Sequence, residues 1–229
     1  MNLEKRKAQL IELLRAFDAA EESDLRGKVI ALVPVWEQLS KVGKALVPNG
    51  LRRAARDRLL IYFKSYPKVV ITRQELVIVS GISEWARRVR ELRTELGWPI
   101  VSGKVAREMQ REGDIVPGED FPDCSEMKAD DYIMTGLEQD REAAFRWKVA
   151  YDIRQQRKSA RESILEFLLR NVGKPVKGDE LSYVANDKTE WARRVRELRA
   201  EEGWQISTHW NGCPDLKPGM YILESERQL

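Results

Sequence analysis

Two almost identical segments, 106 residues apart, constrain the fold of this chain more than any other feature. Residues 84–100 read EWARRVRELRTELGWPI and residues 190–206 read EWARRVRELRAEEGWQI, with 14 identities in 17 positions. Weaker likeness extends on both sides of each segment. The chain therefore contains two copies of one module of roughly 80 residues, and a repeat of this kind indicates one supersecondary unit used twice.

Each copy has the same order of expected elements. A helix is followed by a short β-prone piece, a second helix, the long shared helix, a strand, a connection and a closing strand. The shared helix is expected to end at Gly97 and at Gly203, because glycine is the favoured residue just beyond a helix C-terminus. This order is that of a winged helix. The first-copy helix, strand and closing strand are expected at 56–66, 98–102 and 132–135, and the second-copy ones at 160–171, 204–208 and 221–224.

The rest of the chain frames these modules. Apolar residues at helical spacing predict one helix within 3–20 and another within 24–42, with Ser23 as N-cap and Pro34 as a kink or break. We expect a mainly α protein of the α+β class, with an N-terminal helical segment and tandem winged-helix modules that carry small β-hairpin wings. The expected domains are an N-terminal helical segment at 1–50 that packs or dimerises, a first winged helix with a long acidic wing at 51–137, and a linker helix with the second, DNA-recognising winged helix at 138–229.

The formal net charge of +3 conceals a segregated charge distribution. Residues 141–161 carry seven Lys or Arg against two acids, and each copy of the shared helix has a charge of +2. The expected first wing, 103–131, carries four Lys or Arg against nine acids. Basic helices within a winged-helix frame indicate a surface that follows DNA phosphates.

The shared helix is the best candidate for DNA recognition. Trp191, Val195 and Leu198 fall on one face and are expected in the core, and Arg193 lies opposite. A solvated arginine face is the plainer interpretation of this pattern. In a helix-turn-helix the N-terminal part of the second helix enters the major groove. The predicted DNA contacts on these two helices are Arg87, Arg88, Lys188, Thr189, Arg193, Arg194 and Arg196.

The second wing adds further candidates. Asn211 and Gly212 form a dipeptide that strongly favours a tight hairpin turn. His209 and Trp210 precede it as an exposed pair that could touch base edges; alternatively, the indole folds back on its own module. Asn211 and Lys217 are further predicted DNA contacts on this wing.

Two acidic clusters could supply catalytic carboxylates. Asp123, Glu126 and Lys128 follow the PD…ExK pattern of metal-dependent nucleases, although their spacing is unusually short and a solvated wing is the ordinary interpretation. Glu22 and Asp24 form the second cluster, which is also what a helix N-terminus favours electrostatically. Asp123 and Glu126 are the candidate metal ligands, since Mg²⁺ prefers oxygen ligands.

Other site classes are disfavoured. The two cysteines, Cys124 and Cys213, are too far apart for a zinc motif, and His209 is the only histidine. No apolar run is long enough for a membrane span, and the N-terminus lacks the apolar stretch of a signal peptide. A cytoplasmic protein without membrane association is expected.

Four segments together resemble the BisI family of 5-methylcytosine-dependent type II restriction endonucleases: LRGKVIALVPVWEQL (25–39), GISEWARRVRELRTELGWPI (81–100), MKADDYI (127–133) and TEWARRVRELRAEEGW (189–204). The resemblance implies a homodimer that cleaves double-stranded DNA at GCNGC sites carrying several 5-methylcytosines, with Mg²⁺ as cofactor, and that restricts modified phage DNA. It also implies methyl recognition near the C-terminus, where His209 and Trp210 are the candidates by position.

Two further hypotheses remain open. One is a non-catalytic winged-helix DNA-binding protein, either a regulator or a methyl-DNA reader. The other is a helical scaffold without a nucleic-acid role, which the paired arginine helices disfavour.

Overall fold

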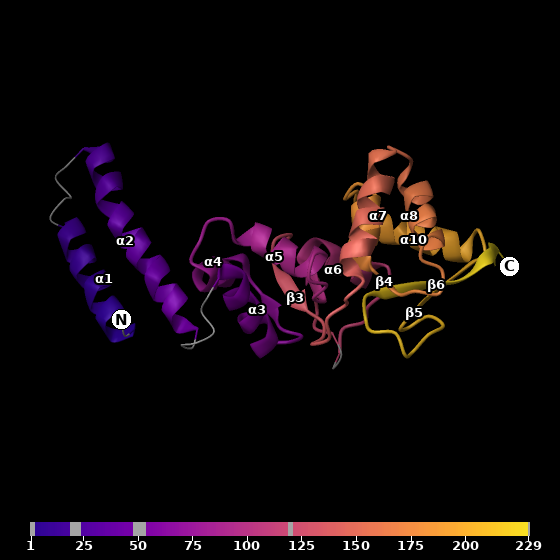
Figure 1. Ribbon diagram of the computed structural model, residues 1–229, viewed down its shortest axis with the longest axis horizontal. Helices are drawn as coiled ribbons and strands as arrows, with labels where there is room; N and C mark the ends of the chain where they lie inside the picture. Colours follow the sequence, from indigo (N-terminus) through magenta and orange to yellow (C-terminus); the bar gives the residue numbers. More distant parts are fainter. Residues whose placement is uncertain (1–2, 19–23, 48–53, 119–120, 229) are drawn as a thin grey trace. The chain divides into compact units, whose positions relative to one another are not determined.

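The computed structural model describes residues 3–18, 24–47, 54–118 and 121–228 (Figure 1). The chain divides into two compact units. The first unit comprises the chain up to Ser65 together with Arg73–Glu91, and the second comprises Tyr66–Thr72 and Leu92–Leu229. Within the described ranges, none of the helices combines the length and the apolar composition needed to cross a membrane.

The first unit begins with two paired helices, α1 (Leu3–Asp18) and α2 (Leu25–Leu46). The buried Gln38 amide joins them, because it donates to the Arg6 carbonyl at 2.9 Å. Two expectations need correction here. The N-cap is Asp24, whose carboxylate accepts from the Gly27 amide at 2.7 Å, while Ser23 lies outside the described residues. Pro34 lies inside α2, which continues through it, so the expected break is absent, while the alternative of a kink stays a prediction.

The first unit also contains α3 (Ala55–Ser65), α4 (Arg73–Ser80) and the start of α5 (Trp85–Thr94). Arg58 on α3 donates to the carbonyls of Val79 and Ser80, and Tyr62 donates to Glu75 at 2.7 Å. These contacts fix α3 against α4.

The second unit contains two small antiparallel sheets with equivalent strand orders. The first has the order β1-β3-β2, from β1 (Val70–Ile71), β2 (Ile100–Ser102) and β3 (Tyr132–Met134). The second has the order β4-β6-β5, from β4 (Val176–Lys177), β5 (Trp204–Thr208) and β6 (Met220–Gln228). In both, the first strand pairs with the last, as the winged-helix order requires, so the expected mainly α architecture with small β wings is confirmed.

The helices of the second copy complete this pattern. The linker helix α7 (Ala143–Gln155) precedes α8 (Ala160–Leu169), α9 (Gly178–Val184) and the shared helix α10 (Trp191–Ala200). Helix α8 starts with a capping box in which Ser159 and Glu162 bond each other's backbone amides. Trp191, Val195 and Leu198 are fully buried, as the helical periodicity predicts.

The expectation of a solvated acidic first wing is wrong. Residues 103–111 form a helix, α6 (Gly103–Arg111), whose Val105, Ala106 and Met109 are buried. Farther along, Ile115, Phe121, Cys124 and Met127 are buried too. All of these side chains belong to one hydrophobic core cluster with the second module, which explains why the acidic insertion folds.

Close packing at Gly178 shows how tightly α6 fits. A Cβ atom at this position would lie 2.8 Å from Met109 Sδ and 3.1 Å from the Trp191 ring. The absence of a side chain at Gly178 therefore lets Met109 of the first module pack beside the buried indole of the second.

The second wing also differs from the two-residue hairpin that Asn211 and Gly212 predict. The strand pairing ends at Thr208 and Tyr221, so the connection spans residues 209–219. Asn211 and Gly212 still form a turn, with Gly212 at φ +95°, but this turn is local to the start of the longer connection.

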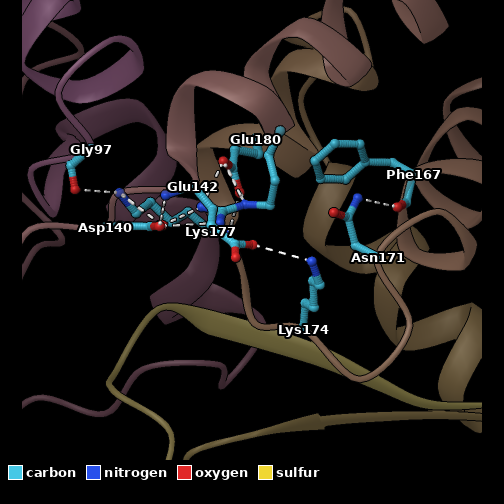
Figure 2. Close-up of polar contacts among 9 residues, drawn as sticks. Gly97, Asp140, Glu142, Phe167, Asn171, Lys174, Lys177 and Glu180 are labelled. Atoms are coloured by element: carbon cyan, nitrogen blue, oxygen red, sulfur yellow. Dashed lines mark hydrogen bonds and ion pairs between the residues drawn. The ribbon is translucent and has the colours of Figure 1, made fainter.

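A buried ionic network links the end of α5 to α7 and α9 (Figure 2). Arg146 Nε lies 3.1 Å from both carboxylate oxygens of Glu180, and Arg146 also bonds Asp140. Lys177 donates to the Gly97 carbonyl at 2.9 Å and lies 3.8 Å from Asp140. Burial raises the pKa of Glu180, and the Arg146 charge opposes that rise. The network therefore depends on each buried charge keeping its partner.

Replacing Arg146 should expose this dependence. Arg146→Met leaves the buried Glu180 carboxylate without its partner cation. We therefore expect the free energy of unfolding to fall by about 3–5 kcal/mol. The double variant Arg146→Met/Glu180→Met should recover much of this loss. Urea unfolding measures both, with Lys148→Met at an exposed position of α7 as the control. A cost for Arg146→Met equal to that of the control would contradict the assignment.

Candidate nucleic-acid interface

Helix α10 presents arginines opposite its buried face. Side-chain exposure is 48% for Arg193 and 50% for Arg196, whereas Trp191 on the opposite face is fully buried. Helix α5 repeats the arrangement, with Arg87 exposed and Val89 and Leu92 buried. The two shared helices thus have the same division into a packed face and a cationic face.

A glutamate orients the arginines on each helix. Glu197 lies 2.6 Å from Arg194 and 3.2 Å from Arg193. On α5, Glu91 lies 2.5 Å from Arg88 and 3.5 Å from Arg87. Hydrogen bonds from the arginines lower the pKa of both glutamates. Exposed ion pairs within one helix contribute only about 0.3–0.5 kcal/mol to stability. Because these pairs are weak, the arginines can exchange the glutamate for a phosphate.

The acidic insertion covers the C-terminal half of α10. Arg196 Nη1 lies 2.8 Å from Glu112, and Arg199 lies 3.8 Å from Asp114. Asp114 is buried and accepts a 2.8 Å hydrogen bond from the Tyr221 hydroxyl, and burial raises its pKa to about 6. Arg196 is therefore engaged within the protein, and the cationic surface that remains lies toward the N-terminus of α10.

The N-terminus of α10 is held by the first module. Glu190 adopts a left-handed conformation (φ 71°), and its side chain provides no cap among the described residues. Instead, the buried Glu108 carboxylate on α6 lies beside the Ala192 backbone in the first turn of α10. Burial raises the pKa of Glu108, and Arg111 and the Ala192 backbone oppose the rise. Lys188 and Thr189, just before α10, are exposed as predicted.

The wing residues are less exposed than the sequence predicts. His209 and Trp210 are half-buried and contact edge to face, with ring centroids 4.6 Å apart. The His209 Nδ1 atom lies 2.7 Å from the Leu216 carbonyl oxygen, and Trp210 packs against the core cluster. The expectation of an exposed pair is therefore wrong, because the core holds the indole. Asn211 is exposed, and Lys217, which is exposed too, forms an ion pair with Glu138.

The structure places the candidate carboxylates in local contacts. Asp24 caps α2 in the first unit, and Glu22 lies outside the described residues. In the second unit, Asp123 accepts from the Gln110 amide at 2.7 Å and from the Ser125 backbone at 3.0 Å, which lowers its pKa. Glu126 is exposed, and so is Lys128, whose backbone amide donates to Asp131.

These contacts do not form a metal-binding cluster. Among the described residues, no three Asp, Glu, His or Cys side chains come close enough to hold a metal ion. The donor set described here therefore does not fit Mg²⁺, which needs several oxygen ligands in octahedral geometry.

Three cations on α6 are absent from the DNA contacts that the sequence predicts. Lys104, Arg107 and Arg111 line a cavity of about 480 Å³, together with Ser125 and Thr189. The net charge of 103–131 concealed them, because nine acids outnumber four cations there. Their spacing of three and four residues within a helix was the signal that could have revealed a basic face.

Comparison with known proteins matches the two modules separately. The family model described as the KpnI N-terminal domain matches residues 56–135 and 161–224, which together make up more than half of the chain. The first stretch runs from α3 to the end of β3, and the second from α8 into β6. No curated protein and no solved structure matches the chain significantly. KpnI is a type II restriction enzyme, and the match supports a restriction-enzyme relationship without singling out the BisI family. The chain belongs to the KpnI N-terminal domain family, with two copies of that domain in tandem.

Proposed function

We propose that this protein binds double-stranded DNA as part of a restriction system. One observation carries the proposal: the family match to a restriction-enzyme domain occurs twice, and each time it includes a shared helix with an outward arginine face. A winged helix places this helix in the major groove.

The charges of the second unit favour contact through the N-terminal half of α10. Lys188 and Arg193 are exposed there, and Arg193 pairs with Glu190 and Glu197. Arg196 and Arg199 instead face acids of the insertion. Phosphate contacts by such cations position the protein, and base-edge contacts by arginine supply sequence specificity. A bidentate arginine–guanine contact contributes about 1–3 kcal/mol of discrimination.

The finer proposal is a Mg²⁺-dependent endonuclease that cleaves GCNGC sites carrying several 5-methylcytosines. The resemblance of the four segments named above to the BisI family supports it. The carboxylates of the described residues do not fit a Mg²⁺ site.

The main alternative is a DNA-binding protein that does not cleave DNA. A specific observation favours it: Asp123, the central residue of the nuclease-like pattern, is engaged by Gln110 and Ser125. In this case the tandem modules would locate a site for another protein or act as a regulator.

We further propose that two copies pair through α2. This helix exposes Leu25, Val29, Val33 and Trp36, spaced as one continuous apolar stripe. A second copy is the occupant that fits best, because a helix stripe can pair with itself about a two-fold axis. Such an axis also matches the near-palindromic symmetry of a GCNGC site.

The α10 assignment predicts weaker DNA binding by Arg193→Glu. Replacing a phosphate-facing cation with an anion should raise the Kd for duplex DNA at least about tenfold, or 1.4 kcal/mol. Fluorescence anisotropy with a labelled duplex measures this. Arg227→Glu, at an exposed position near the end of β6, is the matched control. Equal affinities of Arg193→Glu and wild type would refute the recognition-helix assignment.

The endonuclease proposal predicts methylation-dependent cutting. With Mg²⁺, the protein should cleave a GCNGC duplex that carries 5-methylcytosines and leave the unmethylated duplex and the EDTA control intact. Alanine substitutions at Glu22, Asp24, Asp123 and Glu126, scored for cutting with binding retained, would locate the carboxylates. Binding of the methylated duplex without cutting at any enzyme excess would favour the non-catalytic alternative.

The pairing proposal predicts a dimer that a charge on α2 disrupts. Light scattering after size exclusion should give twice the chain mass for wild type and one chain mass for Trp36→Glu, since burying an unpaired charge is costly. Arg26→Glu on the same helix, also exposed, serves as control. A monomeric wild type at micromolar to millimolar concentrations would exclude this pairing.

A further inference from the structure

We propose that the cavity on α6 binds a backbone phosphate of duplex DNA, so that the helix inserted in the first wing extends the DNA contact of α10. This inference rests on the proposed DNA binding and adds a second, separate element to it.

The three cations share one face of α6. Lys104, Arg107 and Arg111 occupy positions i, i+3 and i+7 of a nine-residue helix, which places them within about 60° of one another at 100° per residue. The opposite side of the helix carries the buried Val105, Ala106 and Met109. The basic stripe is therefore held in place by the core beneath it.

The cavity beside this stripe offers the groups that an anion needs. Its volume is about 480 Å³, and its lining adds the Ser125 and Thr189 hydroxyls to the three cations. The acid in the lining, Glu108, lies 3.6 Å from Arg111, so its charge is partly compensated by the protein. Lys104 and Arg107 therefore remain to attract an anion.

Arg107 is the cation that the fold itself does not use. Lys104 donates to the Asp187 carbonyl in the turn before α10, and Arg111 lies close to Glu108 and Glu112. Arg107 is exposed and forms no ion pair or hydrogen bond with the described residues. The arginines of α10 all pair with acids. Arg107 has no such pair among the described residues and lines a cavity with two other cations, so we infer that its partner is an external anion.

The location of the cavity points to DNA as the source of this anion. Thr189 lines the cavity and directly precedes the N-terminal half of α10. Lys104 and Glu108 both fasten α6 to this end of α10. A duplex that contacts Lys188 and Arg193 would thus present a neighbouring phosphate to Arg107.

The salt dependence of DNA binding tests this assignment. Each phosphate contact that is lost lowers the slope of log K against log[salt] by about 0.9 in B-DNA. We therefore expect Arg107→Gln to bind a duplex more weakly, with a salt slope smaller in magnitude by about one. Its discrimination between DNA sites should be unchanged, because phosphate contacts carry no sequence information. Arg227→Gln, which removes one exposed charge near the end of β6, should leave the slope as in wild type. An unchanged thermal midpoint in Arg107→Gln verifies folding.

The possible outcomes are distinct. An unchanged slope for Arg107→Gln, with wild type binding duplex DNA, overturns the α6 assignment and leaves the proposed function standing. A wild-type protein that binds no duplex overturns both. Calorimetric titration of wild type with inorganic phosphate gives a further arm: binding of free phosphate that Arg107→Gln abolishes, without any change in the DNA slope, would assign the cavity to a free anion and overturn the proposal.

Discussion

The packing of α6 against the second winged helix is the contact on which the rest of the second unit depends. Met109 fills the space that Gly178 leaves beside the Trp191 ring, and the buried Glu108 lies beside the first turn of the helix to which Trp191 belongs. The buried Asp179 adds an ion pair, since its carboxylate lies 2.7 Å from the Arg93 guanidinium. An insertion in one repeat thus completes the core and the capping of the other.

This packing also explains the uneven charge of the chain. The acids that follow α6 lie against the C-terminal half of α10, where Glu112 and Asp114 face Arg196 and Arg199. The cations of α6 lie at the other end, beside Thr189. One insertion therefore neutralises the half of α10 that packs internally and adds positive charge next to the half that remains exposed. This arrangement favours DNA contact at the N-terminal half.

The sequence predicted what depends on local periodicity and on the repeat. Trp191, Val195 and Leu198 are buried as expected, and both sheets have the expected wings, because these features follow from patterns within a few residues. It did not predict α6, since a high acid content concealed the spacing of Val105, Ala106 and Met109. It also placed His209 and Trp210 at the surface, because the Trp210 contacts come from residues distant in sequence. The catalytic interpretation of Asp123 and Glu126 stays a prediction.

Hydrogen exchange of the full chain with and without a duplex tests the central claim most directly. The claim is that DNA contacts the N-terminal half of α10 and the exposed face of α6 together, because the core fixes one to the other. It predicts that duplex DNA slows exchange in the peptides covering 185–196 and 103–113 at the same protein occupancy. Protection confined to other segments, or slowing in 185–196 with none in 103–113, would contradict it.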